Sequence, residues 1–518
     1  MRRRDFLTGS LLAATAACSR PQSATAKRPN ILLVISDDQS WQDAGAYAAT
    51  HVSTPAFDRI ARDGVLFKNS FCASPSCTPS RSAVLMGRHV WQQEQAGVLY
   101  GAMPPKIPLY THLLEDAGYF TGYTGKGWAP GDWQALGASR NPCGREYNSI
   151  KHAEPLRPGI EPADYAANFQ QFLKDKPKQS PFCFWLGSKE PHRIYDQGSA
   201  VRLGKKIEDV KVPPYLPDTP EVRSDLLDYY LEIDWYDQQL AKTLKILEAE
   251  GSLDDTLIVV TSDNGMPFPR AKVNLYDAGV HMPLSIRWGN RLKAGSSIDT
   301  LVSHTDFAPT FLEAAGVPIP AGIAGQSLLP LLIGGGGGTL RESRAIYCGM
   351  ERHVMARPNG AGYPMRSIRT KDFLYIRNFA PDHWPTGGDF SSSNNTPHGD
   401  IDGAPTKDVL LSATARAKFP KQVELCLDKR PAEELYELIS DPGQIRNLAT
   451  DRRFAAQRDQ LRNRLEAYLT ETGDPRVEGK DPWQSYVYQQ TSGYGSSFNT
   501  SLPDAVREAA RTKVHKPE

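Results

Sequence analysis

The pattern of apolar positions predicts a parallel β-sheet in the first part of the chain. Three short apolar runs occupy residues 31–36, 181–187 and 257–262. Uninterrupted apolar runs of this length are typical of strands that are covered on both faces, as in a parallel sheet. Residues 118–128 (GYFTGYTGKGW) add a fourth candidate strand, which is followed by a glycine-rich turn.

Two segments show the pattern of amphipathic helices. Residues 54–61 begin with Thr-Pro, a suitable capped start, and residues 221–251 form a long amphipathic segment. Apolar strands that alternate with such helices predict an α/β fold in which helices flank the sheet.

The rest of the chain predicts a smaller second domain. Five glycines at 334–338 mark a flexible joint. Beyond them, alternating segments such as 373–376 predict an antiparallel sheet, residues 454–472 predict a helix, and the polar stretch 389–405 predicts a loop. We therefore expect four parts: a leader and linker (1–28), the main α/β domain (29–333), an α+β subdomain (339–475) and an extended tail (476–518).

Composition limits the function classes. A chain of 518 residues is too long for one simple core, which fits two domains. The 60 basic and 59 acidic residues leave a formal charge of +1, so nothing indicates nucleic-acid binding, and a soluble or peripheral enzyme fits. The seven cysteines have no regular spacing and no CxxC pair, so neither a zinc site nor a disulfide framework is indicated.

The N-terminus predicts export. Residues 2–7 (RRRDFL) resemble a twin-arginine signal, and the apolar run at 11–17 is too short to span a membrane. The stretch around Cys18 (AACS) resembles a lipoprotein cleavage box, although Thr15 stands where Leu is preferred. Ordinary cleavage near this alanine-rich stretch is the alternative. Both predict a periplasmic or extracellular protein, lipid-anchored through Cys18 in the first case.

Polar side chains follow two of the apolar runs. Asp37 and Asp38 follow residues 31–36, and Asp263 and Asn264 follow residues 257–262. The carboxyl edge of an α/β sheet is where ligands bind, and buried carboxylates there require neutralisation. Four oxygen-bearing side chains suit Ca²⁺ or Mg²⁺ rather than zinc. The alternative for the Asp pair is two solvated loop acids.

Residues 77–88 (CTPSRSAVLMGR) predict a helix start with a thiol at its mouth. Thr78 or Ser80 can cap this helix, and Pro79 suits its first turn. Because a helix start presents free N–H groups and a positive dipole end, it favours anions and lowers the pKa of a thiol. Arg81, one turn on, adds a cation. The alternative for Cys77 is a buried thiol before an ordinary helix.

Cys-x-Pro-Ser-Arg followed by Leu-x-Gly-Arg strongly resembles the signature of the type I sulfatases. The resemblance extends over about residues 29–475. It implies an alkaline-phosphatase-like fold with a mixed, mostly parallel sheet flanked by helices, and a smaller C-terminal domain. It also implies that Cys77 is oxidised to formylglycine, the catalytic nucleophile of the family. The partner would be a formylglycine-generating enzyme or an anaerobic sulfatase-maturing enzyme. Since twin-arginine cargo folds before export, the oxidation would take place in the cytoplasm.

The resemblance implies a set of site residues. Asp37, Asp38, Asp263 and Asn264 match the family's metal ligands, which implies Ca²⁺, with Mg²⁺ less favoured, and an oxygen of the formylglycine at 77 or of the sulfate completes the shell. Arg81 would hold the formylglycine. Lys126 and Lys272 match cations that bind sulfate, and His192, in a Pro-His pair after residues 181–187, matches a sulfate ligand and proton donor. Three further residues are weaker candidates for the substrate pocket: His89, His353 and Arg357.

One position departs from the family pattern. Trp128 stands where the Gly-Lys-x-His element has its histidine, which removes an expected hydrogen-bond partner of the hydrated aldehyde. His304 and Asp306 recur in the family, and we interpret them as structural residues between a strand and the helix at Pro309.

The mechanism implied by the resemblance needs a nucleophile with two hydroxyls. One hydroxyl of the hydrated aldehyde attacks sulfur, aided by Asp263 or another carboxylate as base, and His192 or Lys272 protonates the leaving oxygen or nitrogen. Deprotonation of the second hydroxyl then expels sulfate and restores the aldehyde. A serine has one oxygen and cannot complete this last step.

The run at 263–269 (DNGMPFP) and the segments 363–370 and 434–451 resemble the heparan N-sulfatase branch, the N-sulfoglucosamine sulfohydrolases. The implied function is an exo-acting enzyme on sulfamates or sulfate esters of carbohydrates, in glycosaminoglycan degradation. The alternatives are a carbohydrate O-sulfatase or arylsulfatase, and a phosphonate or phosphate monoester hydrolase, although simple phosphatases carry Ser or Thr at the position of Cys77. A non-catalytic glycan-binding lipoprotein is the non-enzyme alternative, supported only by Trp128.

Overall fold

The computed structural model describes residues 28–154, 156–289, 291–334, 344–388 and 397–486. The predicted export signal, the cleavage box at Cys18, residues 335–338 of the glycine run, residues 389–396 of the predicted loop and residues 487–518 of the tail lie outside this part of the chain. None of the helices within the described ranges is long and apolar enough to cross a membrane.

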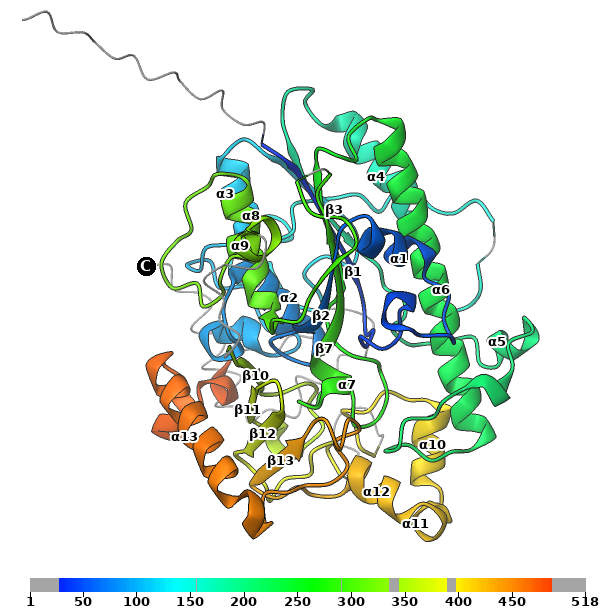
Figure 1. Cartoon of the computed structure of the whole chain (residues 1–518), viewed down its shortest axis with the longest axis vertical. Coiled ribbons are helices and arrows are strands. Elements are labelled where there is room, and N and C mark those ends of the chain that lie inside the picture. The colour runs from blue at the N-terminus through cyan, green and yellow to red at the C-terminus, as the bar shows by residue number, and fades with distance from the viewer. Residues whose placement is uncertain (1–27, 155, 290, 335–343, 389–396, 487–518) are drawn as a thin grey trace, which may run out of the picture.

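A mixed, mostly parallel sheet forms the centre of the larger domain (Figure 1). The strand β1 (Asn30–Ser36) lies between β5 (Phe182–Gly187) and β6 (Thr256–Ser262) and is parallel to both. On the far side of β5 lies β3 (Phe120–Gly125), followed by the short β4 (Arg145–Glu146). The four predicted strands are therefore neighbours, as expected for strands with both faces covered.

The other edge contains the antiparallel pairs. Next to β6 lies β7 (His281–Arg287), which is antiparallel both to β6 and to β2 (Val65–Phe71). The sheet ends with the short strands β8 (Ser296–Ile298) and β9 (Val302–Ser303), both parallel to β2.

Helices cover both faces of this sheet (Figure 1). Leu32 and Val34 of β1 pack toward one layer, and Ile31, Leu33 and Ile35 pack toward the other. The first layer contains α1 (Pro55–Arg62), α4 (Tyr165–Asp175) and the 30-residue α6 (Pro220–Ala249). The second contains α2 (Cys77–Met86), α3 (Tyr110–Asp116), α8 (Phe307–Ala314) and α9 (Leu329–Ile333). As predicted, His304 and Asp306 join β9 to α8, and Asp306 pairs with Arg344.

A separate four-stranded antiparallel sheet forms the C-terminal part, as predicted. Its order is β10 (Ile346–Met350), β11 (Met365–Arg369), β12 (Phe373–Asn378) and β13 (Glu433–Glu437). The predicted helix is α13 (Ala455–Glu471), whose Leu461, Leu465 and Leu469 pack against this sheet.

Three short helices follow the predicted loop: α10 (Pro405–Leu411), α11 (Ala415–Lys418) and α12 (Pro420–Leu427). They connect the two domains, because Thr406 at the start of α10 donates its hydroxyl to Asp225 of α6 at 2.6 Å. The described part of the predicted tail is not simply extended. It forms two 3₁₀ turns, Pro475–Glu478 and Pro482–Ser485, and Trp483 is buried. The proposed domain boundaries stay predictions.

Candidate active site

Adjacent strands bring the four candidate metal ligands together. Asp37 and Asp38 follow β1, Asp263 and Asn264 follow β6, and the last residues of the two strands, Ser36 and Ser262, are paired. Asp38 adopts the left-handed backbone region with φ of 71°, an uncommon conformation for a residue other than glycine. All four side chains are buried, and carboxylate oxygens of the three aspartates lie within 4.8 Å of one another.

This donor set fits a hard cation. The Nδ2 of Asn264 donates to Asp38 Oδ1 at 2.7 Å, while the buried Asn264 Oδ1 has no hydrogen-bond partner among the described residues. A buried polar oxygen without a partner requires an explanation, and a bound ion is one. Three convergent carboxylates and a free amide oxygen supply only oxygen ligands, so the cluster can hold a divalent metal ion such as Ca²⁺ or Mg²⁺.

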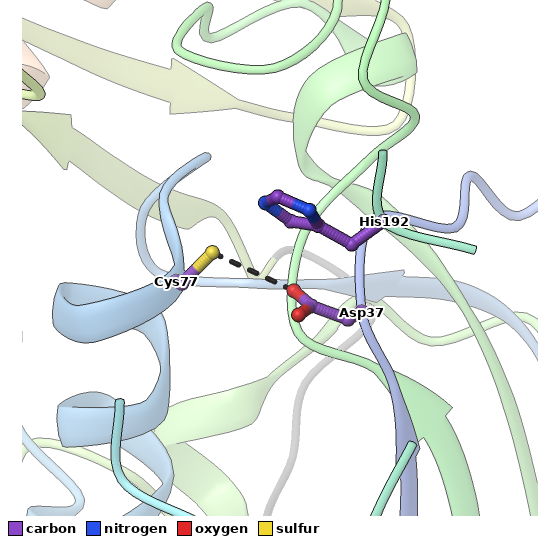
Figure 2. A group of neighbouring side chains, drawn as sticks. All are labelled: Asp37, Cys77 and His192. Carbon is purple, nitrogen blue, oxygen red and sulfur yellow. Dashed lines mark hydrogen bonds between the residues drawn. The ribbon is translucent and has the colours of Figure 1, made fainter. Parts of the chain in front are cut away.

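Cys77 is the first residue of α2 and faces this cluster. Its Sγ lies 3.5 Å from Asp37 Oδ1 (Figure 2). The N-cap is Ser76, not Thr78 or Ser80, whose hydroxyls bind the backbone oxygens of Pro130 and Asp263. Burial raises the pKa of the Cys77 thiol, against the expectation that the helix start lowers it, because desolvation outweighs the nearby Lys126.

Arg81 and Lys126 form the cationic side of the cluster. Arg81 is fully buried and donates from Nε to Asp263 Oδ2 at 2.8 Å. Lys126 donates from Nζ to Asp37 Oδ2. Burial alone would raise the pKa of Asp37, but Lys126, followed by His192 and Arg81, holds it well below its usual range. Burial raises the pKa of Asp263 to about 7, and the charge of Asp37 contributes to this rise.

His192 and Lys272 lie together beside Asp38. The Nζ of Lys272 lies 2.7 Å from Asp38 Oδ2 and 3.1 Å from His192 Nε2. The Nδ1 of His192 lies 2.6 Å from the carbonyl oxygen of Arg193. Because a carbonyl only accepts, Nδ1 carries the proton, and Nε2 faces Lys272 and the cavity. Burial opposes the charge on Lys272, but Asp38 and then Asp402 raise its pKa well above the usual value.

A cavity of about 570 Å³ opens over these groups. The first domain contributes Asp37, Cys77, Lys126, His192 and Lys272, and the second contributes His353, Asp402 and Lys407. His353 therefore lies where the sequence placed it, and its Nδ1 lies 2.9 Å from Ser76 Oγ, beside Cys77. Burial lowers the pKa of His353 to about 4, so this ring is neutral at neutral pH.

Two weaker candidates lie away from this cavity, and their prediction as pocket residues is corrected. His89 stacks on Trp91 with ring centroids 4.5 Å apart, and its Nε2 lies 2.8 Å from the Tyr468 hydroxyl. Arg357 is buried and binds Asp400 at 2.7 Å and the carbonyl oxygens of two neighbouring residues, Trp384 and Pro385. His89 joins the first domain to α13 of the second, Arg357 joins segments within the second domain, and neither residue lines the cavity over Cys77.

Trp128 is a core residue and not part of the cavity lining. It is fully buried, and its indole Nε1 donates to Ser82 Oγ of α2 at 2.8 Å. Trp128 therefore packs behind α2 in the core. The histidine that lines the cavity together with Cys77 is His353.

Sequence reasoning missed Asp402, whose Oδ2 lies 3.2 Å from Lys272 Nζ. No motif marks it, and its segment was interpreted only as a polar loop. It also missed Lys189 and Arg193, which line the cavity on either side of the Pro-His pair. Their position next to His192 was a usable signal.

Comparisons with known proteins agree with this geometry. Residues 29–317 match the Sulfatase family, and residues 271–384 match the family described as N-sulphoglucosamine sulphohydrolase, C-terminal. The chain is 29% identical over 509 residues to the human N-sulphoglucosamine sulphohydrolase, covering 88% of this chain and 93% of that protein. It is 28% identical over 458 residues to an ulvan-active sulfatase of Formosa agariphila, covering 87% of this chain and 82% of that protein.

Solved structures show the same fold. One, a complex with the substrate D-glucosamine-2-N,6-O-disulfate, has a TM-score of 0.63 at 22% identity, covering 88% of this chain and all of that one. The phosphonate monoester hydrolase of Agrobacterium radiobacter has a TM-score of 0.62 at 17% identity, covering 89% of this chain and all of that one. The fold is thus alkaline-phosphatase-like, and, because the Sulfatase match spans more than half of its length, the chain belongs to the sulfatase family and is a hydrolase of sulfate esters or sulfamates.

Proposed function

We propose that this sulfatase releases sulfate from the terminal N-sulfated glucosamine of a glycan chain. The support for this substrate is the match of residues 271–384 to the C-terminal part of N-sulphoglucosamine sulphohydrolases, together with the human relative of that name. A structural neighbour that binds a 2-N,6-O-disulfated glucosamine supports the same substrate class. A carbohydrate O-sulfatase is the second candidate, because the ulvan-active relatives cover as much of the chain.

The observation that carries the proposal is the arrangement of cations around Cys77. Lys126 and Lys272 approach the carboxylates beside Cys77 from two sides, and His192 lies next to Lys272. A sulfate or sulfamate group is an anion whose oxygens need several positive partners, and fixed cations in a buried site stabilise the charge that develops during its transfer. A cavity of about 570 Å³ is within the usual range for small-molecule sites.

Two groups would complete the chemistry. Asp37, Asp38, Asp263 and Asn264 would hold Ca²⁺, which supplies positive charge to the sulfate oxygens and increases the acidity of a bound hydroxyl. Formylglycine made from Cys77 by a maturing enzyme supplies, when hydrated, two hydroxyls on one carbon.

The residues of the chain then have separate roles. Lys126 and Lys272 bind the non-bridging oxygens of the sulfate. Arg81, held by Asp263, fixes the start of α2 against the turn after β3. His192 donates its Nδ1 proton to the carbonyl oxygen of Arg193, so Nε2, which takes up a proton from Lys272 or from solvent, is the nitrogen that passes a proton to the leaving nitrogen or oxygen. From the N-terminal sequence we further propose export by the twin-arginine route to the periplasm or cell exterior, with ordinary cleavage near the alanine-rich stretch and lipidation at Cys18 as the two alternatives for its processing.

The test is expression with a formylglycine-generating enzyme, mass spectrometry of the peptide containing position 77, and assay of sulfate release from N-sulfo- and 6-O-sulfoglucosamine. We expect conversion at Cys77 and release from the N-sulfated sugar. Cys77→Ser is the matched control, since it keeps one hydroxyl and lacks the second. Release from the 6-O-sulfated sugar alone would favour the O-sulfatase, and no release by the converted protein from either sugar would refute the proposed function.

A further inference from the structure

A second cavity, of about 860 Å³, lies between the two domains. Its walls come from the loop after β1, the middle of β2, the segment before α6, the residues around α7 (Asp277–Val280) and the turn after β13. Figure 1 shows α7 beside the small sheet. Among the described residues, this cavity shares no lining residue with the cavity over Cys77.

Buried polar groups line this cavity without partners. The Tyr215 hydroxyl, Gln444 Nε2 and His281 Nδ1 have no hydrogen-bond partner among the described residues, and each side chain is at least nine-tenths buried. His281 Nε2 lies 2.8 Å from the carbonyl oxygen of Lys68, so it carries the proton, and Nδ1, which lies 3.9 Å from Asp277 Oδ2, is an acceptor. Unsatisfied buried groups are costly, and two donors with one acceptor suit the hydroxyls of a ligand.

Aromatic rings give the cavity flat apolar walls. Trp41 stacks on His281 with centroids 4.6 Å apart and meets the edge of Tyr47, and both Trp41 and Tyr47 are partly exposed. Tyr215 and Tyr230 lie on the same lining. Partly exposed aromatic walls with a few polar groups are typical of sites for ligands that have both apolar and polar faces, as sugar rings do.

The charge of this lining is positive. It contains Lys68, Lys211, Arg270 and Arg369 against two carboxylates, and Lys68 also pairs at 3.1 Å with Asp299, which lies outside the lining. Both carboxylates already have partners, Asp277 with Arg369 at 3.2 Å and Asp43 with His51 at 3.0 Å. Arg270 binds backbone oxygens of Leu425 and Gln444, which carry no charge, and Lys211 is exposed at the rim with no acidic partner in the described ranges. The excess charge favours an anionic ligand.

We propose that this cavity is a secondary binding site for an anionic saccharide, which holds a sulfated or carboxylated segment of the glycan away from the active site. The choice of a sugar rests on the proposed function, whereas the cavity, its charge and its unpaired groups do not. Such a site would increase the affinity for long chains and leave the hydrolysis of a single sugar unchanged.

The test uses the full chain with Cys77→Ser, so that no turnover occurs, and a hexasaccharide of alternating N-sulfated glucosamine and uronic acid. Hydrogen exchange then reports on the two cavities separately. We expect the sugar to protect residues 209–216 and 438–446, and a neutral hexasaccharide of glucose to protect neither segment. Lys211→Glu should weaken binding at this site at least about fivefold, and Tyr215→Phe, which removes only the unpaired hydroxyl, should also weaken it.

The matched control is Lys245→Glu, an equal change of charge at an exposed position on α6 that lines neither cavity. Protection confined to residues 351–355 and 399–407 overturns the second site and leaves the proposed function intact. Protection at 209–216 and 438–446, with no sulfate release by the matured Cys77 protein, supports the second site and refutes the proposed function. Equal losses of affinity in Lys211→Glu and Lys245→Glu overturn the second site.

Discussion

Arg81 Nε donates to Asp263 Oδ2 at 2.8 Å, and both side chains are fully buried. The same guanidinium donates from Nη1 to the carbonyl oxygens of Lys126 at 2.7 Å and Gly127 at 3.0 Å. One side chain therefore joins the start of α2, the end of β6 and the turn after β3. These segments carry the predicted nucleophile, a predicted metal ligand and a lysine predicted to bind sulfate.

Replacement of Arg81 by lysine should disrupt this junction. An ammonium group lacks the planar array of N–H donors with which the guanidinium reaches Asp263 and the two carbonyl oxygens at once. We expect Arg81→Lys to lose about 3 kcal/mol of unfolding free energy and about 100-fold in kcat/KM for sulfate release. Denaturant titration and steady-state assays measure the two effects. Arg453→Lys, at an exposed ion pair with Asp451, is the control. Equal behaviour of the two variants would contradict the role assigned to Arg81.

Asn264 offers a test of the metal site. Calcium that binds only the folded protein should raise its Tm. At a calcium concentration of a hundred times the Kd, the free energy of unfolding should increase by about 2.7 kcal/mol. Asn264→Ala should reduce this increase in Tm because it removes a ligand oxygen. Asn168→Ala, at an equally buried asparagine of α4 that binds the backbone of Ile150, should lower stability but keep the response to calcium. Undiminished stabilisation by calcium in Asn264→Ala would remove this residue from the ligand set.

His192 is predicted to protonate the leaving group, so its effect should depend on that group. His192→Gln should reduce kcat for a sugar N-sulfate by about 10² to 10⁴, the usual range for loss of a general acid. An aryl sulfate with an acidic phenol needs no such proton, and its kcat should fall much less. The measurement is kcat for both substrates with both proteins. Similar reductions for the two substrates would assign His192 to sulfate binding alone.

Trp128→His restores the residue that the family pattern has at this position, yet we expect no gain in activity. The indole fills a buried site behind α2 and donates to Ser82, so a smaller ring leaves a cavity and costs about 3 kcal/mol of stability. Trp128→Phe, which loses the N–H donor and less volume, is the matched comparison. Higher kcat in Trp128→His than in the wild type would show that the histidine reaches the substrate.

Glu232 on α6 predicts how the stability of the protein depends on pH. Burial, and then the nearby Glu190, raises the pKa of this carboxyl from 4.5 to about 8. Between these values the folded state holds a proton that the unfolded state has lost, so stability falls as pH rises, by about 1.4 kcal/mol per pH unit. Glu232→Gln should remove this contribution and be more stable than the wild type at pH 8. Denaturation midpoints at pH 5 and pH 8 measure it, with the exposed Glu250→Gln as the control. A midpoint of Glu232→Gln that follows the wild type at both pH values would refute the prediction.

The central strands and the cluster of candidate metal ligands could be predicted from sequence for a physical reason. A strand covered on both faces must be apolar throughout, as in β1 and β6, and the first polar residues after such runs must lie at the edge of the sheet. Asp37 and Asp263 were therefore visible without the structure. The antiparallel position of β7 and the cap at Ser76 depend on contacts between distant segments, which no local pattern records.

Asp402 and His89 also show that a local sequence pattern does not record contacts between distant segments. Asp402 lies in a polar stretch that predicts only a loop, and it meets Lys272 because α10 is bound to α6. His89 follows the signature closely, but α2 ends at Met86, its C-cap Gly87 has φ of 66°, and the chain turns away toward Tyr468. Proximity in sequence was therefore a poor guide to proximity in space for residues just outside the motifs.

The contribution of His353, Asp402 and Lys407 to the active-site cavity has an evolutionary consequence. The residues assigned to sulfate transfer lie between positions 37 and 272, whereas these three come from a later part of the chain and face the cavity from the other side. Mutation in that later part can change which sugar is accepted while the residues for sulfate transfer stay fixed.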